Sequence, residues 1–169
     1  MDAVDLSCVR GDITVQDVDA VVNAANQTMR GGGGVDGAIH RAGGPAVLAD
    51  CVKRFPHGLA TGQAGWTTGG NLPARYVIHV VGPNYRRGQT DRRLLVSCYA
   101  NALAVADELG VTSIAFPLVS AGVYGWPLTD AVDAAVTTLL ATPTMVRDAR
   151  IVAFSPRDYD VVRARLAAD

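Results

Sequence analysis

The chain has 169 residues, of which 49% are hydrophobic and 18% carry a charged side chain, and its net charge is -1 at pH 7. This length and apolar content predict that residues 1–169 form one domain with a substantial core. The nearly balanced charge excludes a general attraction to nucleic acid or anionic membranes, so an anionic ligand has to be held by local geometry. The three cysteines form no CxxC pair, the first residues do not resemble a signal peptide, and no apolar run reaches the ~20 residues of a membrane span. We therefore expect a cytoplasmic protein without a disulfide framework.

The first half of the chain alternates strand-like and helix-like segments. Strands are predicted over Val4–Arg10 and over the segment Val18–Ala25, which is rich in β-branched residues. A run of four glycines follows, and then short helices are expected over Asp36–Ala42 and Ala46–Phe55. Two further strands, over residues 63–68 and 75–82, flank the turn sequence GGNLPA.

The second half continues the alternation to the end of the chain. Its clearest helix covers Asp91–Leu109, where apolar residues recur on one face and Gly110 provides the stop. Then come a strand over 113–119, a helix over 128–141, a strand over 149–154 and a helix over 158–168. Alternation with short connections predicts an α/β fold, a three-layer αβα sandwich around a mixed, mostly parallel sheet. Ligands of such sheets bind beyond the carboxyl ends of the strands, which directs attention to the loops NQTMRGGGGVDG and SAGVYGWP.

The glycine run after the second strand is open to three interpretations. It can be a flexible connection, or a phosphate-binding loop in which backbone N–H groups converge at a helix N-terminus without side chains in the way. It also contains a GxGxxG match over Gly32, Gly34 and Gly37, typical of dinucleotide-binding folds. That match does not follow its strand directly, and no ribose-binding acid comes about 20 residues later.

Longer segments add a family resemblance. The stretch GDITVQDVDAVVNAANQTMRGGGGVDGAIHRAGG (Gly11–Gly44) resembles the signature of the macrodomain family, in particular its MacroD-type hydrolase branch. The similarity continues through LPARYVIHVVGP and AFPLVSAGVYGWP and covers essentially the whole chain in the same order. The resemblance implies a three-layer αβα sandwich that binds ADP-ribose in a cleft. It also implies removal of ADP-ribose from acidic side chains of modified proteins, or of the acetyl group from O-acetyl-ADP-ribose.

The resemblance assigns the adenine end of the ligand to three residues. Asp12 is similar to the acid that accepts a hydrogen bond from the exocyclic amine, and Ile13 would line the same place. Phe154 resembles the aromatic residue that packs on the adenine. Without the resemblance, a Gly-Asp turn is the favoured explanation of Asp12, and a buried core position is the default for Phe154.

The resemblance places the pyrophosphate between the two glycine-bearing loops. Tyr124 resembles the aromatic residue that covers the distal ribose. The predicted walls use backbone N–H groups rather than basic side chains, and they consist of Gly32, Gly33, Gly34 and Val35 on one side and Ser120, Ala121, Gly122, Val123, Tyr124 and Gly125 on the other.

Asn26 and Asp36 carry the chemistry that the resemblance implies. Asn26 would touch the distal ribose hydroxyls, and Asp36 would contact a water near the anomeric carbon. Asp36 then acts as a general base, or a substrate phosphate positions the water while Asp36 orients the ribose. A helix cap is the alternative role of Asp36. For Asn23 we expect a structural role at the strand end, and for His40, one turn after Asp36, packing or tuning of the acid.

The remaining histidines do not suggest a metal site. His79 is expected to be buried and hydrogen-bonded within its strand, and His57 lies on a loop. The sequence departs from many relatives at Ala121, at Gly65 with Trp66, and at Arg30, which we expect to add a cation at the cleft rim.

These observations predict a monomeric hydrolase without metal or cofactor. Its expected partners are ADP-ribose, ADP-ribosylated proteins and O-acetyl-ADP-ribose, with nucleic acid only where it is ADP-ribosylated. A non-catalytic reader of ADP-ribose would use the same cleft. An NAD-dependent oxidoreductase would rest on the GxGxxG match alone.

Overall fold

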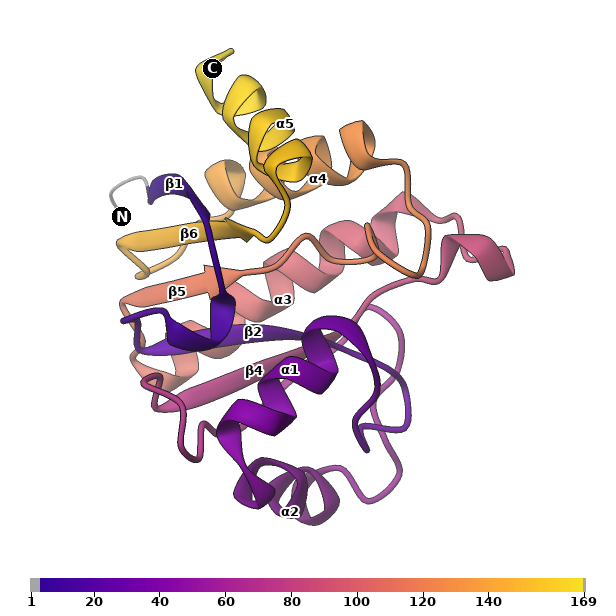
Figure 1. Ribbon diagram of the computed structural model, residues 1–169, viewed down its shortest axis with the longest axis vertical. Coiled ribbons are helices and arrows are strands. Elements are labelled where there is room, and N and C mark those ends of the chain that lie inside the picture. The colour runs from indigo at the N-terminus through magenta and orange to yellow at the C-terminus, as the bar shows by residue number, and fades with distance from the viewer. Residues whose placement is uncertain (1–3, 169) are drawn as a thin grey trace.

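The computed structural model describes residues 4–168, in which strands and helices follow one another along the chain (Figure 1). The strands are β1 (Asp5–Arg10), β2 (Ala20–Ala25), β3 (Ala64–Thr68), β4 (Tyr76–Val81), β5 (Ser113–Phe116) and β6 (Asp148–Ala153). The α-helices are α1 (Gly34–Gly43), α2 (Pro45–Arg54), α3 (Arg92–Leu109), α4 (Leu128–Ala141) and α5 (Pro156–Ala167), and two 3₁₀ turns are η1 (Ile13–Val15) and η2 (Tyr85–Arg87).

All six strands join one sheet in the order β1-β6-β5-β2-β4-β3. Every neighbouring pair is parallel except β3 and β4, which confirms the predicted mixed, mostly parallel sheet. The chain extends the sheet to one side of β2 with β4 and to the other side with β5. Such a reversal of strand order leaves a crevice at the carboxyl ends of the strands, where ligands of α/β sheets bind.

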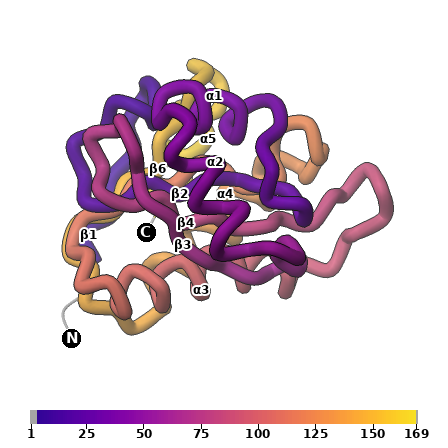
Figure 2. The backbone as a smooth tube through the Cα atoms, turned by 90° about the horizontal axis from the view of Figure 1, so that it is seen from below, coloured from indigo at the N-terminus to yellow at the C-terminus, as the bar shows by residue number. Residues whose placement is uncertain are grey.

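Alternation along the strands produces the two helical layers. On β2, Ala20 and Val22 pack into the larger core together with residues of α3, α4 and α5. Val21, which points to the opposite face, packs with Ile39 of α1 and Ile13 of η1. Figure 2 shows α1 and α2 on one side of the sheet and α3 on the other. The three-layer αβα sandwich is therefore confirmed.

One strand boundary and one 3₁₀ turn differ from the sequence-based expectation in a way that shapes the site. The strand expected over 113–119 ends at Phe116, because Pro117 has no N–H to donate to a neighbouring strand. The chain therefore turns into a loop three residues early. The 3₁₀ turn η2, which the sequence pattern did not predict, lies beside that loop, since Arg86 donates its backbone N–H to the Tyr124 carbonyl at 3.1 Å.

Candidate functional site

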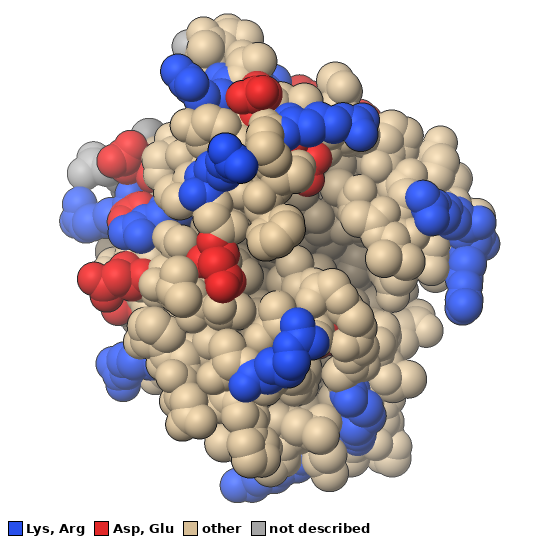
Figure 3. Space-filling model, viewed as in Figure 1, with Lys and Arg blue, Asp and Glu red and all other residues tan. Residues whose placement is uncertain are grey.

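A cleft of about 440 Å³ opens at the carboxyl ends of the parallel strands. Figure 3 shows the molecule hollowed at this place, with mostly uncharged surface around the hollow. The lining comes from the segments after β2, β4 and β5 and from the end of β6, and its charged residues are Asp36 and Asp158. No Lys or Arg of the described residues 4–168 lines it. The backbone N–H groups that the sequence singled out, such as those at the start of α1, are candidate donors to an anion in this cleft.

The glycine run forms one wall of the cleft through Gly32, Gly33, Gly34 and Val35. Helix α1 begins at Gly34, and Gly33 is its N-cap without a capping side chain. The first N–H groups of a helix have no partner within the helix, so they are available to a ligand in the cleft. The four glycines therefore have a structural consequence beyond flexibility, since they bring a bare helix N-terminus to the cleft.

Asn26 and Asp36, the residues expected to carry chemistry, both line the cleft. A β-carbon built on Gly32 would lie 3.0 Å from Asp36 Oδ2 and 3.3 Å from Asn26 Nδ2. The amide and the carboxylate thus border the same point beside Gly32. Asp36 is only 5% exposed, and its Oδ1 accepts a hydrogen bond from Asn23 Nδ2 at 2.7 Å rather than capping the helix. Asp36 also lies in the first turn of α1, where an acid complements the helix dipole, so this part of the helix-cap alternative stands beside the contact with Asn23.

The loop after β5 forms the opposite wall, from Ser120 to Tyr124, with Ala121, Gly122 and Val123 between them. Ser120 has a φ of 65°, a conformation uncommon for residues other than glycine. Its hydroxyl donates to the Pro83 carbonyl at 2.8 Å, and its carbonyl accepts from Trp126 N–H at 2.9 Å. A β-carbon on Gly82 would collide with the Ser120 hydroxyl, so a glycine is needed there. The loop is therefore held in a fixed shape from both ends.

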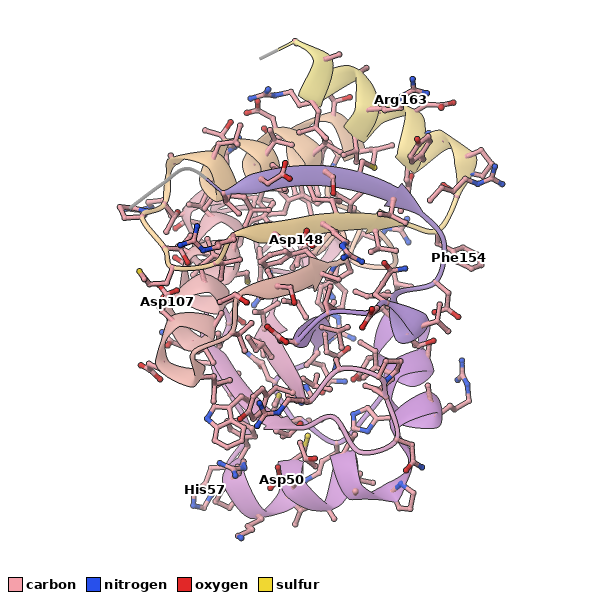
Figure 4. All side chains as sticks on the ribbon, turned by 90° about the vertical axis from the view of Figure 1, so that its left-hand side faces the viewer. Asp50, His57, Asp107, Asp148, Phe154 and Arg163 are labelled. Carbon is pink, nitrogen blue, oxygen red and sulfur yellow. The ribbon has the colours of Figure 1, made fainter. Side chains whose placement is uncertain are left out.

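Phe154 lies at the far end of the cleft, just after β6. The side chain is 86% exposed and projects from the edge of the molecule (Figure 4). The buried-core interpretation of this phenylalanine is therefore wrong, and an exposed ring on a cleft wall is available for stacking. Asp158, in the first turn of α5, also lines the cleft. Asp158 was not predicted from the sequence, although an acid three residues after the N-cap Ser155 is a recognisable helix-start signal.

Five predicted site residues do not line the cleft: Asp12, Ile13, Asn23, His40 and Gly125. Asp12 Oδ1 accepts hydrogen bonds from Thr14 N–H at 2.8 Å and from the Thr14 hydroxyl at 2.7 Å, so it caps η1. The segment still lies close to the Phe154 end, because Gly11 donates its N–H to the Ala153 carbonyl at 3.0 Å.

Asn23 and His40 lie behind the cleft wall, against Asp36. Asn23 is fully buried and donates from Nδ2 to Asp36, and the same amide lies 3.1 Å from Nδ1 of His79. His40 Nε2 is 3.4 Å from Asp36 Oδ1. His79 is fully buried and hydrogen-bonded, as predicted, with Nε2 2.9 Å from the Thr67 hydroxyl. Asp36 is therefore supported from behind by polar groups that do not reach the cleft.

Comparison with known proteins identifies the family of this chain. The Macro domain family model matches residues 22–135. A Macro domain-containing protein of Streptomyces coelicolor is 52% identical over 165 residues, which cover 95% of this chain and 98% of the relative. The chain belongs to the Macro domain family. Its fold matches that of the Oceanobacillus iheyensis macrodomain with ADP at a TM-score of 0.90 and 40% identity, covering 95% of this chain and 89% of that one. The Trypanosoma brucei macrodomain in complex with ADP-ribose matches at a TM-score of 0.88 and 37% identity, covering 95% of this chain and 68% of that one.

One departure from the expected macrodomain pattern has a different role from the one predicted. Arg30 does not add a cation at the cleft rim. Its guanidinium donates to the Phe55 carbonyl at 3.0 Å and lies 3.5 Å from the Cys51 carbonyl, at the end of α2. A cation at this place satisfies the last carbonyls of the helix and complements its dipole. Arg30 thus stabilises the junction between the loop and α2.

A second departure, Gly65, is explained by packing. A β-carbon on Gly65 would lie 2.5 Å from the ring of Phe55, which occupies that space. Gly65 pairs with His79 in the sheet, and the Phe55 ring meets the His79 imidazole edge-on at 6.4 Å between centroids. The neighbouring Trp66 stacks under the Arg54 guanidinium, with 3.7 Å between the Arg54 Cζ and the centroid of the ring. Both residues therefore serve the contact between α2 and the sheet.

The cysteines of this macrodomain do not supply a nucleophile. All three are free thiols, and burial raises the pKa of Cys8 and Cys51 to about 11 and that of Cys98 to about 12. Thiolates, not thiols, attack substrates, so these groups are inert at neutral pH. Within residues 4–168, no cluster of three His, Cys, Asp or Glu side chains is arranged to hold a metal ion, and no helix there has the length and apolarity to cross a membrane.

The burial of His79 has a measurable consequence for stability. Burial, with a smaller contribution from the nearby His40, lowers the pKa of His79 from 6.5 to about 3, while Asp50 acts in the opposite direction. The unfolded chain binds a proton below about pH 6.5 and the folded protein does not. The free energy of unfolding therefore does not depend on the protonation of His79 above about pH 6.5. As the pH falls from there toward 3, His79 lowers it by at most about 1.4 kcal/mol per pH unit.

Urea unfolding at pH 7.5 and pH 5.0 measures this effect. We expect the free energy of unfolding of the wild type to fall by up to about 2 kcal/mol more than that of His79→Asn over this interval. Acidic groups titrate in both proteins, so the difference between them isolates His79. Equal pH dependence in both proteins would contradict a neutral, buried His79.

Proposed function

We propose that this macrodomain is a MacroD-type hydrolase that removes mono-ADP-ribose from aspartate and glutamate side chains, and that it also deacetylates O-acetyl-ADP-ribose. The observation that carries the proposal is the convergence of Asn26 and buried Asp36 on one point of the cleft beside Gly32. A module that only bound ADP-ribose would need the N–H groups and the aromatic surfaces. It would have no need of a desolvated carboxylate directed at the distal ribose.

The proposed arrangement of the ligand follows the lining of the cleft. The pyrophosphate lies between the start of α1 and the loop after β5, where N–H groups replace basic side chains. The adenine stacks on Phe154, with Asp12 on the neighbouring strand end as the proposed acceptor for its amine. Tyr124 covers the distal ribose, which brings the anomeric carbon toward Asn26 and Asp36. Two related macrodomains whose structures hold ADP and ADP-ribose support this choice of ligand.

Both proposed reactions use water as their only co-reactant. In deacetylation the water attacks the acetyl carbonyl carbon, acetate is released, and the ribose oxygen takes up a proton. Removal of ADP-ribose from a side chain proceeds at the anomeric carbon. A bond forms between the water oxygen and the anomeric carbon as the bond from that carbon to the carboxylate oxygen of the modified side chain breaks. The carboxylate leaves with the bonding electron pair. Asp36 takes the water proton as general base, or a substrate phosphate holds the water while Asp36 orients the ribose. Asn26 positions the ribose hydroxyls through its amide.

Phe154→Ala tests the adenine end of the proposed ligand. Stacking of a base on an aromatic side chain contributes about 1–3 kcal/mol, so we expect ADP-ribose to bind roughly 5- to 150-fold more weakly. The ring is 86% exposed, so the free energy of unfolding should not change. Isothermal titration calorimetry checks this, with Leu140→Ala on α4, also an exposed apolar residue, as the matched control. Unchanged affinity would remove Phe154 from the site.

The competing function is a reader that binds ADP-ribosylated partners without cleaving them. Incubation of the wild type with a glutamate-linked mono-ADP-ribosylated protein distinguishes the two, when free ADP-ribose and binding affinity are both measured. Catalytic release supports the hydrolase. Tight binding without release from this substrate or from O-acetyl-ADP-ribose would favour the reader.

We further propose that residues 1–169 act as a single, monomeric cytoplasmic domain. Its partners would then be recognised through the ADP-ribose group, so nucleic acid is a partner only where it carries that group. Size-exclusion chromatography with light scattering checks the oligomeric state. A stable dimer would contradict the proposal.

A further inference from the structure

A row of buried polar groups crosses three neighbouring strands behind the cleft. Asn23 on β2 is paired directly with His79 on β4, and Thr67 on β3 lies on the same face of the sheet, two residues from the partner of His79. All three side chains are fully buried. The row ends at Asp36, whose Oδ1 accepts the hydrogen bond from Asn23 Nδ2 at 2.7 Å. A continuous path of hydrogen bonds therefore links the edge of the sheet to a cleft residue.

The donors and acceptors along this row fix the protonation of the imidazole. The Thr67 hydroxyl donates to the Thr68 carbonyl at 3.0 Å, so its oxygen is free to accept from Nε2–H of His79. The buried Cys51 sulfur, 3.8 Å from the same nitrogen, is a weak second acceptor for that proton. Nδ1 then carries a lone pair and accepts the second proton of the Asn23 amide at 3.1 Å. This is the neutral tautomer with the proton on Nε2, in keeping with the depressed pKa of His79.

The same contacts leave Asn23 with one amide orientation. A flipped amide would direct its oxygen at the Asp36 carboxylate and at the lone pair of His79, two acceptors. In the observed orientation, both protons are used, while Asn23 Oδ1 is buried without a hydrogen-bond partner among residues 4–168. An unpaired buried oxygen costs stability. The Asn23 amide therefore donates to the Asp36 carboxylate while its own oxygen stays without a hydrogen bond from residues 4–168.

We propose that His79 is a positioning residue for the reaction proposed above: its Nδ1 lone pair orients the Asn23 amide, which holds Asp36 Oδ1 and thereby turns Oδ2 toward Asn26 and the cleft. Asp36 Oδ2 is the oxygen that borders Gly32 beside the Asn26 amide. His79 does not line the cleft, so it acts through Asn23 and transfers no proton to substrate. Partners that orient metal-ligating side chains from behind typically matter by about 10- to 100-fold in activity, and we expect the same range for His79.

Two replacements separate this role from packing. His79→Asn can present its amide oxygen near the position of Nδ1 and keep the bond to Asn23. His79→Gln can place its amide nitrogen near Nε2 and keep the bond to Thr67, but has no acceptor toward Asn23. We expect kcat for ADP-ribose release to fall about 10- to 100-fold in His79→Gln and to stay within about 3-fold of the wild type in His79→Asn. ADP-ribose affinity should change less than about 3-fold in both.

The test has an arm that does not depend on turnover. In ¹⁵N-labelled wild type, nuclear magnetic resonance should show His79 protonated on Nε2 and bare on Nδ1 at pH 7 and at pH 5. A protonated Nδ1, equal kcat losses in the two variants, or wild-type kcat in both would overturn the proposal. If the wild type releases no ADP-ribose, the proposed function fails by itself, and the tautomer still decides whether His79 orients Asn23. If a variant does not fold, the tautomer of His79 in the wild type decides whether the imidazole accepts from Asn23.

Discussion

An Asp36→Ala variant is expected to bind ADP-ribose and yet release it from a glutamate-linked substrate roughly 10²- to 10⁴-fold more slowly than the wild type, the range that general acid–base groups contribute. Asp36 is 5% exposed and borders the cleft with Oδ2, so the substitution removes the carboxylate that we propose as the acceptor for the water proton. We expect affinity to be retained because the proposed phosphate and adenine contacts are made by backbone N–H groups and by Phe154, not by the Asp36 carboxylate. Turnover and calorimetry on the same preparation check both parts.

Two controls define what the Asp36 result means. Asp36→Asn preserves the shape of the side chain, so a matching loss of turnover attributes the effect to the charge rather than to a cavity. Asp160→Ala replaces an exposed acid on α5 and should leave turnover unchanged. Normal release by Asp36→Ala would reduce this residue to a structural partner of Asn23.

Gly32→Ala is the second change with a large expected effect. Its methyl group would lie 3.0 Å from Asp36 Oδ2 and 3.3 Å from Asn26 Nδ2, closer than ordinary van der Waals contact. Asp36 has little freedom to yield, because its other oxygen is held by Asn23 at 2.7 Å. A displacement of about 1 Å at a reacting group can reduce the rate about 10²-fold, which is the loss that we expect in kcat.

The structure provides a matched control for the Gly32 replacement. A β-carbon on Gly11 would have nothing closer than Val9 Cγ1 at 4.0 Å, so Gly11→Ala should leave turnover and thermal stability as in the wild type. Thermal unfolding separates a local effect at Gly32 from a folding defect. Full turnover in Gly32→Ala would show that Asn26 and Asp36 do not act at the point between them.

The sequence predicted much of the fold because the determining signals are local. Strand and helix alternation, the stop at Gly110 and the glycine run before α1 all follow from spacing and backbone preference. The two loops were singled out because carboxyl ends of parallel strands converge on one edge, and both line the cleft.

Other features depend on contacts that local patterns do not contain. The hydrogen bond from Arg30 to the Phe55 carbonyl depends on where α2 ends in space. The exposure of Phe154 depends on β6 ending at Ala153. The role of His79 required the register that pairs it with Asn23 and brings Thr67 to the same face. A buried histidine was predictable from its apolar strand, but its partners were not.

The measurement that tests the hydrolase most directly is a single turnover of the wild type on a glutamate-linked mono-ADP-ribosylated protein in H₂¹⁸O. Attack of water on the anomeric carbon puts one ¹⁸O into the released ADP-ribose and none into the freed glutamate carboxylate. Free ADP-ribose kept in the same water for the same time corrects for exchange. Release with the label in ADP-ribose is the predicted result. Binding of the substrate without release, or label in the carboxylate, would contradict the proposed reaction.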